Sequence, residues 1–248
     1  MKILLIRPNR NEVDAKALAD FAIDTQIDPY LEISQVPNVS GAIRMLEALK
    51  APGKKWFVLT SSNALTYWQN LLAPGELEAV VAGFDSIQFA AIGQQTKKQL
   101  LAIGAREVMI ADRFDAESLS ITLSGTSPMP VVIPAGSIAM KTLENSLSAL
   151  GFEIVSEVVY QTNQVANTPG SVNQISQGEF DAVLLRSPSA ARAFLSFNPN
   201  PNLRIFCGGN TTAKTLAGLG VEPDLVAIDP SPEAVAKAIS EYFLKGNH

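Results

Sequence analysis

Short, continuous hydrophobic runs alternate with amphipathic segments along the whole chain. The runs are partly β-branched and cover residues 3–6, 56–59, 89–92, 131–133, 182–185 and 205–207. Such runs are typical of parallel strands that are buried on both faces. Between two of them, Leu143, Leu147 and Leu150 have the spacing of one helix face, and Gly151 indicates the end of that helix. The alternation predicts an α/β fold with parallel sheets that helices cover on both faces.

The second half of the chain repeats motifs of the first half in the same order. IGQQT, which contains Gly93, is matched by CGGNT, which contains Gly208. LTSSNA, which begins at Leu59, is matched by LRSPSA, which begins at Leu185. The offsets are close to half the chain length, so we expect two related copies of about half the chain each.

Composition and charge exclude several classes of protein. Of the 248 residues, 47% are hydrophobic and 17% are charged, which predicts one large or two small folded domains rather than a disordered chain. The net charge of -5 provides no general attraction for nucleic acid. No run approaches the roughly 18 apolar residues of a membrane span, and the start has no secretory signal pattern. We therefore expect a cytoplasmic monomer that has a small-molecule ligand and neither a nucleic-acid nor a membrane partner.

The residue inventory also excludes common catalytic and metal centres. The chain has one cysteine, Cys207, and one histidine, His248, which is the last residue. An internal disulfide is therefore impossible, and a Cys/His zinc site or a nucleophile paired with histidine is not supported. There is no phosphate-binding P-loop pattern and no GxGxxG fingerprint. We expect no metal and no cofactor.

Each predicted strand is followed by a turn of small, hydrogen-bonding residues. The carboxyl ends of parallel strands lie at one edge of a sheet, where helix N-termini bind anions. Any single turn is most simply an ordinary helix cap. Six such turns together favour a site for several carboxylates or phosphates. The candidate ligand-binding residues in these turns are Arg7, Thr60, Ser61, Ser62, Asn63, Gly93, Gln94, Thr96, Gly136, Arg186, Ser187, Ser189, Gly209, Asn210, Thr211 and Thr212.

In their order and spacing, these motifs resemble the uroporphyrinogen-III synthase family. The matching segments are IRP, LTSSNA, AIGQQT, VVYQT, LRSPSAARAF and CGGNTTAKTL. The resemblance implies two doubly wound parallel-sheet lobes joined by two crossing β-strands, with a discontinuous first lobe. It places lobe one at residues 1–33 and 167–248, lobe two at 38–157, and the crossing segments at 34–37 and 158–166.

The resemblance also implies the reaction. Hydroxymethylbilane, a linear tetrapyrrole with many carboxylates, would lose water and close to uroporphyrinogen III, with ring D inverted through a spiro intermediate. This would make the chain a lyase of haem and sirohaem biosynthesis that needs no cofactor. Hydroxymethylbilane synthase, which supplies the substrate, is then an expected transient partner.

Tyr160, in VVYQT, is the catalytic candidate that the resemblance provides. It would face the reacting end of the substrate and donate a hydrogen bond or a proton to the departing hydroxyl. The alternative is a structural tyrosine whose ring packs on one face and whose hydroxyl binds a backbone carbonyl.

Two arginines are candidate carboxylate clamps. Arg7 follows the first strand, and its alternative role is a surface ion pair with an acid such as Glu12. Arg186 stands where the family usually has threonine, whereas Ala135 stands where the family commonly has arginine. One hypothesis is that the cationic role has moved from the Ala135 turn to Arg186, and the alternative is that Arg186 is only a variant residue in contact with solvent.

Two rival functions remain open at this stage. Two α/β lobes joined by paired strands also describe small-molecule binding proteins that perform no chemistry. A sensor with a degenerate site is the third reading, and the missing arginine at Ala135 is its only support.

Overall fold

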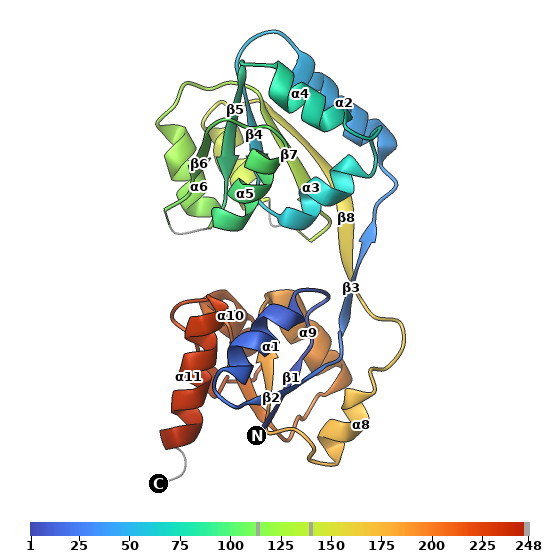
Figure 1. The fold of residues 1–248 in the computed structure, drawn as a ribbon, viewed down its shortest axis with the longest axis vertical. Helices are drawn as coiled ribbons and strands as arrows, with labels where there is room; N and C mark the ends of the chain where they lie inside the picture. The colour runs from blue at the N-terminus through green and yellow to red at the C-terminus, as the bar shows by residue number, and fades with distance from the viewer. Residues whose placement is uncertain (113–114, 139–140, 246–248) are drawn as a thin grey trace. The chain divides into compact units, whose positions relative to one another are not determined.

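The computed structural model describes residues 1–112, 115–138 and 141–245, and its chain divides into two compact units. Unit 1 contains Met1–Ile33 and the chain from Asn163 onward, and unit 2 contains Ser34–Thr162. The chain therefore passes between the units twice. The strands β3 (Leu31–Gln35) and β8 (Ile154–Gln164) contain these two passages (Figure 1).

Unit 1 is built on a five-stranded sheet whose order is β11-β10-β9-β1-β2. These strands are β1 (Lys2–Leu5), β2 (Asp24–Ile27), β9 (Ala182–Leu185), β10 (Arg204–Cys207) and β11 (Leu225–Val226), and their pairings are parallel. One face packs on α1 (Asn11–Ala19) and α11 (Pro232–Lys245). The other face packs on α8 (Ser171–Ser176), α9 (Pro188–Phe197) and α10 (Asn210–Gly218).

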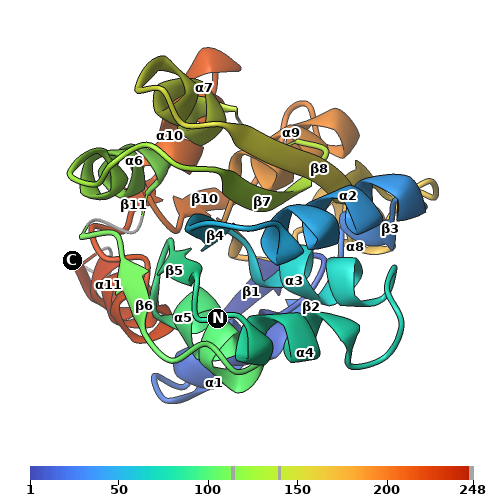
Figure 2. The same ribbon diagram turned by 90° about the horizontal axis from the view of Figure 1, so that it is seen from above.

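Unit 2 is built on a six-stranded sheet whose order is β3-β8-β7-β4-β5-β6. Its inner strands are β8, β7 (Val131–Gly136), β4 (Lys55–Leu59) and β5 (Ile87–Ala91), and β3 and β6 (Val108–Ile110) lie at the two edges. The helices on one face are α2 (Val39–Lys50), α3 (Ser62–Gln69), α4 (Glu76–Gly83) and α5 (Gln94–Ala102). The helices on the other face are α6 (Ala116–Ser124) and α7 (Thr142–Ala149) (Figure 2).

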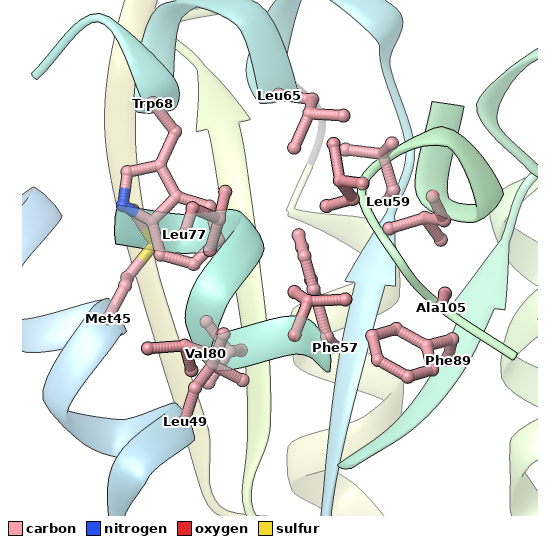
Figure 3. Close-up of a cluster of buried hydrophobic side chains, with 14 of the residues drawn as sticks. Met45, Leu49, Phe57, Leu59, Leu65, Trp68, Leu77, Val80, Phe89 and Ala105 are labelled. Atoms are coloured by element: carbon pink, nitrogen blue, oxygen red, sulfur yellow. The ribbon is translucent and has the colours of Figure 1, made fainter. Parts of the chain in front are cut away.

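The larger core of unit 2 lies between its sheet and the helices α2 to α5. Phe57 of β4 packs edge-on against Trp68 of α3, with ring centroids 5.2 Å apart, and Phe89 of β5 lies beside it (Figure 3). The indole N–H of Trp68 donates to the carbonyl of Ala42 in α2, so a polar group buried in this core is satisfied. The core fixes α3 and α5, and therefore the turns that precede them, on the sheet.

The two sheets share one strand order, and this explains the sequence repeat. The order β11-β10-β9-β1-β2 in unit 1 corresponds to β6-β5-β4-β7-β8 in unit 2. Each unit combines strands from both halves of the chain. The parallel α/β architecture predicted from the hydrophobic pattern is confirmed, and all six predicted strand segments are strands.

An ion pair joins α2 to β8 in unit 2. The guanidinium of Arg44 lies 2.7 Å from one carboxylate oxygen of Glu157, and the amide of Asn38 donates to the other oxygen at 2.9 Å. Burial would raise the Glu157 pKa, but the hydrogen bonds from Arg44 and Asn38 outweigh it and lower the pKa below its usual 4.5.

We expect Glu157→Gln to destabilise the protein by about 1 kcal/mol at pH 7, because the charged hydrogen bonds are lost. A lowered pKa stabilises the fold above the unfolded-state pKa, and this stabilisation disappears as the pH falls through the folded-state value. The difference in unfolding free energy between the wild type and Glu157→Gln, measured by urea unfolding, should therefore shrink below about pH 4.5. A difference that stays constant down to pH 3 would contradict this role for Glu157.

Candidate functional site

In unit 2, three of the predicted turns lie at the same edge of the sheet. The turns at 60–63 and 93–96 follow β4 and β5, whereas Ala135 and Gly136 are the last two residues of β7 itself, so only Ser137 of the third predicted turn follows its strand. The three strands are neighbours in the sheet and are paired in parallel. Because parallel strands end at one edge, residues 60–63, 93–96 and 135–137 are brought to the same side of unit 2. Two of these turns lead directly into helices, since α3 begins at Ser62 and α5 begins at Gln94.

Unit 1 has the same arrangement. The turns at residues 7–9, 186–189 and 208–212 follow β1, β9 and β10, which are also neighbouring parallel strands. The turns lead into α1, α9 and α10. The free N–H groups at the starts of these helices therefore lie at one edge of each sheet, which suits the binding of carboxylates.

Tyr160 lies at this edge of unit 2, and glycine makes room for it. The Tyr160 hydroxyl donates to Oγ of Ser61 at 3.1 Å, and its ring stacks on Tyr67 with a centroid distance of 5.8 Å and an interplanar angle of 20°. A Cβ placed on Gly136, the partner of Tyr160 across the strands, would lie 2.5 Å from Cζ of the ring. The ring therefore lies against bare backbone, and the hydroxyl contacts a side chain rather than a backbone carbonyl.

Several candidate side chains also shape the starts of the helices. The Thr96 hydroxyl donates to the Gly93 carbonyl at 2.9 Å and accepts from the Gly93 N–H at 3.2 Å. Ser187 accepts from the Ala190 N–H at the start of α9. Thr96, Gly136 and Thr212 are buried. The half-buried candidates are Arg7, Thr60, Ser61, Ser62, Asn63, Gly93, Arg186, Ser187, Ser189 and Gly209, and the exposed ones are Gln94, Asn210 and Thr211.

The turn after β1 is held by one buried side chain. The amide of Asn11 accepts from the backbone N–H of Arg7 at 3.1 Å and donates to the Arg7 carbonyl at 2.8 Å. Between them, Arg10 has φ 61° and ψ 22°, a left-handed conformation that costs a residue with a side chain about 1 kcal/mol or more. The Asn11 bonds offset this strain and fix the backbone of the turn.

The acid that pairs with Arg7 is Asp14 rather than Glu12. Nη1 of Arg7 lies 3.0 Å from Oδ2 of Asp14, whose side chain is only 1% exposed. The same oxygen lies 3.6 Å from Nε of Arg186. Both candidate arginines of unit 1 therefore contact one buried carboxylate.

Sequence reasoning missed Asp14, Asn11 and Tyr67. Asp14 and Asn11 lie in an N-terminal helix segment, NEVDAK, which reads as an ordinary polar helix start. Asn11 and Asp14 are both buried in the structure, but nothing in the local sequence indicates this. The contact of Asp14 with Arg186 joins segments that are distant in the sequence.

Among the residues that the structure describes, the cysteine and the possible metal ligands add no further candidate to the site. Cys207 is buried at the end of β10, and burial raises its thiol pKa to about 12. His248 lies outside the described residues. Within the described part of the chain, no three His, Cys, Asp or Glu side chains are grouped as a metal site would require. Across the same residues, no helix has both the length and the apolar character needed to cross a bilayer.

Comparisons with known proteins agree with this architecture. A curated uroporphyrinogen-III synthase from Chlorobaculum parvum is 23% identical over 96% of this chain and 98% of its own length. A crystal structure of a mutant uroporphyrinogen III synthase from Thermus thermophilus superposes with a TM-score of 0.66 and 16% identity, over 99% of each chain. The Helicobacter pylori uroporphyrinogen-III synthetase also superposes with a TM-score of 0.66, at 19% identity, over 97% of this chain and 98% of that one.

These structural matches show that the two-lobe fold is shared. The model of the family described as uroporphyrinogen-III synthase HemD matches residues 13–237, which covers nearly all of both units. The chain therefore belongs to the uroporphyrinogen-III synthase HemD family and is an enzyme of tetrapyrrole synthesis.

Proposed function

We propose that this protein acts as a cyclising hydro-lyase that converts hydroxymethylbilane to uroporphyrinogen III and water. The observation that carries the proposal is the placement of three hydrogen-bonding turns at one edge of each sheet, in a chain that the family model matches over residues 13–237. Such turns suit a substrate that bears many carboxylates. The activity needs no group other than the substrate and the chain.

The proposed reaction begins with departure of the terminal hydroxyl. The C–O bond breaks with its electron pair on oxygen, and a proton completes the water molecule. The substituted carbon of ring D attacks the resulting azafulvene cation and forms a spiro intermediate. This intermediate fragments and closes again with ring D inverted, and a ring proton is released, so that the net change is the loss of one water.

The task of the protein in this scheme is selectivity. Without it, the bilane would close head to tail with ring D unchanged. A fixed conformation that brings the substituted carbon nearest to the cation favours inversion, which is an effect of orientation rather than of a strong acid or base. Backbone N–H groups and hydroxyls in the turns of each unit would hold the carboxylates and still release a product.

Within unit 2, Tyr160 is the residue we assign to the departing hydroxyl. It is half-buried, and its phenol is directed by Ser61 and by the stacked ring of Tyr67. When substrate is bound, the phenol can turn its single O–H from Ser61 to the leaving oxygen as negative charge develops there, and it can then accept a hydrogen bond from the Ser61 hydroxyl. The candidate residues of the turns bind the carboxylates in this proposal, and Arg7 provides a cation in unit 1.

The function is tested by supplying the purified protein with freshly generated hydroxymethylbilane. Oxidation of the products and separation of the porphyrin isomers should give mainly type III, whereas a control without protein gives type I. Type I alone in both samples would overturn the proposal. A binding protein without catalysis would show thermal stabilisation by the bilane with no change in isomer composition.

Hydroxymethylbilane synthase is our proposed transient partner, because its product is unstable. The ratio of the two enzymes cannot report the contact, because excess free bilane closes spontaneously to type I in any case. The contact is tested by sedimentation of the two purified proteins: a faster-sedimenting species that forms only in the mixture would support it, and independent sedimentation of the two proteins would argue against it.

A further inference from the structure

The two arginines of unit 1 differ in how they are held around Asp14. Nη2 of Arg186 donates to the Pro230 carbonyl at 2.6 Å, while its Nε faces Asp14. Nη1 of Arg186 lies so close to Gly208 that a Cβ there would be 2.8 Å away. The Arg186 side chain is 11% exposed, whereas that of Arg7 is 22% exposed. Arg186 is thus packed among three segments of unit 1, and Arg7 keeps more access to solvent.

Glycine at position 208 is part of this arrangement. Gly208 directly follows β10, and Arg186 directly follows the neighbouring strand β9. The guanidinium of Arg186 lies in the space that a side chain at position 208 would fill. Pro230 lies just before α11, and Asp14 lies in α1. Arg186 therefore connects its own turn with three other segments, which contain Asp14, Gly208 and Pro230.

The charges in this cluster do not balance. Arg7 and Arg186 share one carboxylate, and Arg10 lies near enough to oppose the charge on Arg186. Burial lowers the Arg186 pKa, and the attraction of Asp14 partly opposes this effect. Two buried polar atoms, Oδ1 of Asp14 and Nη1 of Arg186, have no hydrogen-bond partner. The excess positive charge makes an incoming anion favourable here.

We propose that Asp14 and Arg186 are positioning residues that hold the guanidinium of Arg7 in place for a carboxylate of the substrate. Arg186 keeps Asp14 fixed, and Asp14 orients the more exposed Arg7. Asp14 can neutralise only one of the two guanidinium groups that contact it. Because Arg186 takes part of this compensation, the positive charge of Arg7 is left partly uncompensated and can attract a carboxylate of the ligand. This inference rests on the proposed function, and it changes the role of Arg186 from a clamp to a support.

A double-mutant cycle tests the inference, with Arg7→Met, Arg186→Thr and the double variant. Loss of a guanidinium–carboxylate contact that is equal in ground and transition states raises KM without lowering kcat. We expect Arg7→Met to raise KM for hydroxymethylbilane about 10-fold or more, and Arg186→Thr about 5-fold, with kcat within about 2-fold. The double variant should have the KM of Arg7→Met, because Arg186 acts through Arg7.

Other outcomes would overturn the inference. Multiplied effects in the double variant would mean that Arg186 contacts the substrate independently, and an unchanged KM in Arg186→Thr would mean that it only supports the fold. Arg192→Thr, which removes an exposed arginine from α9, is the matched control and should leave KM unchanged. If Arg186→Thr does not fold, Arg186→Lys carries the test, with a KM between those of the wild type and Arg7→Met.

A second measurement separates this inference from the proposed function. Binding of uroporphyrin III, a stable octacarboxylate, can be titrated by thermal shift in the same variants. If the wild type made no type III isomer, the proposed function would fail. The same pattern of coupled losses in uroporphyrin affinity would still support the role of Arg186, and additive or absent losses would overturn it.

Discussion

Replacing Tyr160 by phenylalanine is expected to lower kcat for uroporphyrinogen III formation by about 10- to 100-fold. The substitution removes the hydroxyl that we assign to the leaving oxygen and keeps the ring that stacks on Tyr67. It also breaks one hydrogen bond to Ser61, which is half-buried, so the loss of unfolding free energy should not exceed about 1 kcal/mol. A large effect on rate with a small effect on stability is the signature of a group that acts on the reaction.

The measurement is the initial rate of type III formation, together with the isomer ratio. A slower enzyme leaves more bilane to close spontaneously, so the type I fraction should rise in Tyr160→Phe. Tyr242→Phe is the matched control, because Tyr242 loses only a long 3.5 Å hydrogen bond to Asp224 in unit 1. Equal kcat in Tyr160→Phe and the wild type would remove Tyr160 from the mechanism.

The fold was predictable where hydrophobic runs are continuous. Strands such as β4 and β9 are buried along their whole length, so their sequences show the pattern directly. β2 was not predicted because its sequence, DTQI, is only partly buried, and β11 has just two residues. Leu150 was expected on the buried face of α7, but it lies just after the helix and is 47% exposed. Sequence periodicity therefore identified the helix but placed its end one residue too late.

The candidate site was predictable only in part. The position of the turns follows from parallel strands, whose carboxyl ends coincide at one edge. The roles of individual side chains do not follow, because they depend on contacts between distant segments. Arg186 was predicted as a carboxylate clamp or a solvent contact, whereas Asp14, Gly208 and Pro230 enclose it. Tyr160 was identified by resemblance alone, and no local pattern indicated that Gly136 would face its ring.

Gly136→Ala should abolish most of the activity, because it displaces the Tyr160 ring. The new Cβ would lie 2.5 Å from Cζ and 2.7 Å from the hydroxyl oxygen, closer than non-bonded atoms can remain. The ring must therefore move, and its hydrogen bond to Ser61 should be lost. We expect a kcat at least as low as that of Tyr160→Phe, with a loss of about 1 to 3 kcal/mol in unfolding free energy from overpacking.

Steady-state rates and urea unfolding measure the two effects separately. Adding Tyr160→Leu to Gly136→Ala shortens the side chain that clashes, so stability should recover while activity does not. Gly83→Ala is the matched control in unit 2, because a Cβ at that position meets nothing within 4 Å. If Gly136→Ala retained the wild-type kcat, the position of the phenol against the β7 backbone would be irrelevant to the reaction. If instead its activity falls and Tyr160→Phe causes little further loss in the same background, the two residues act as one unit, and glycine at position 136 serves to place the phenol.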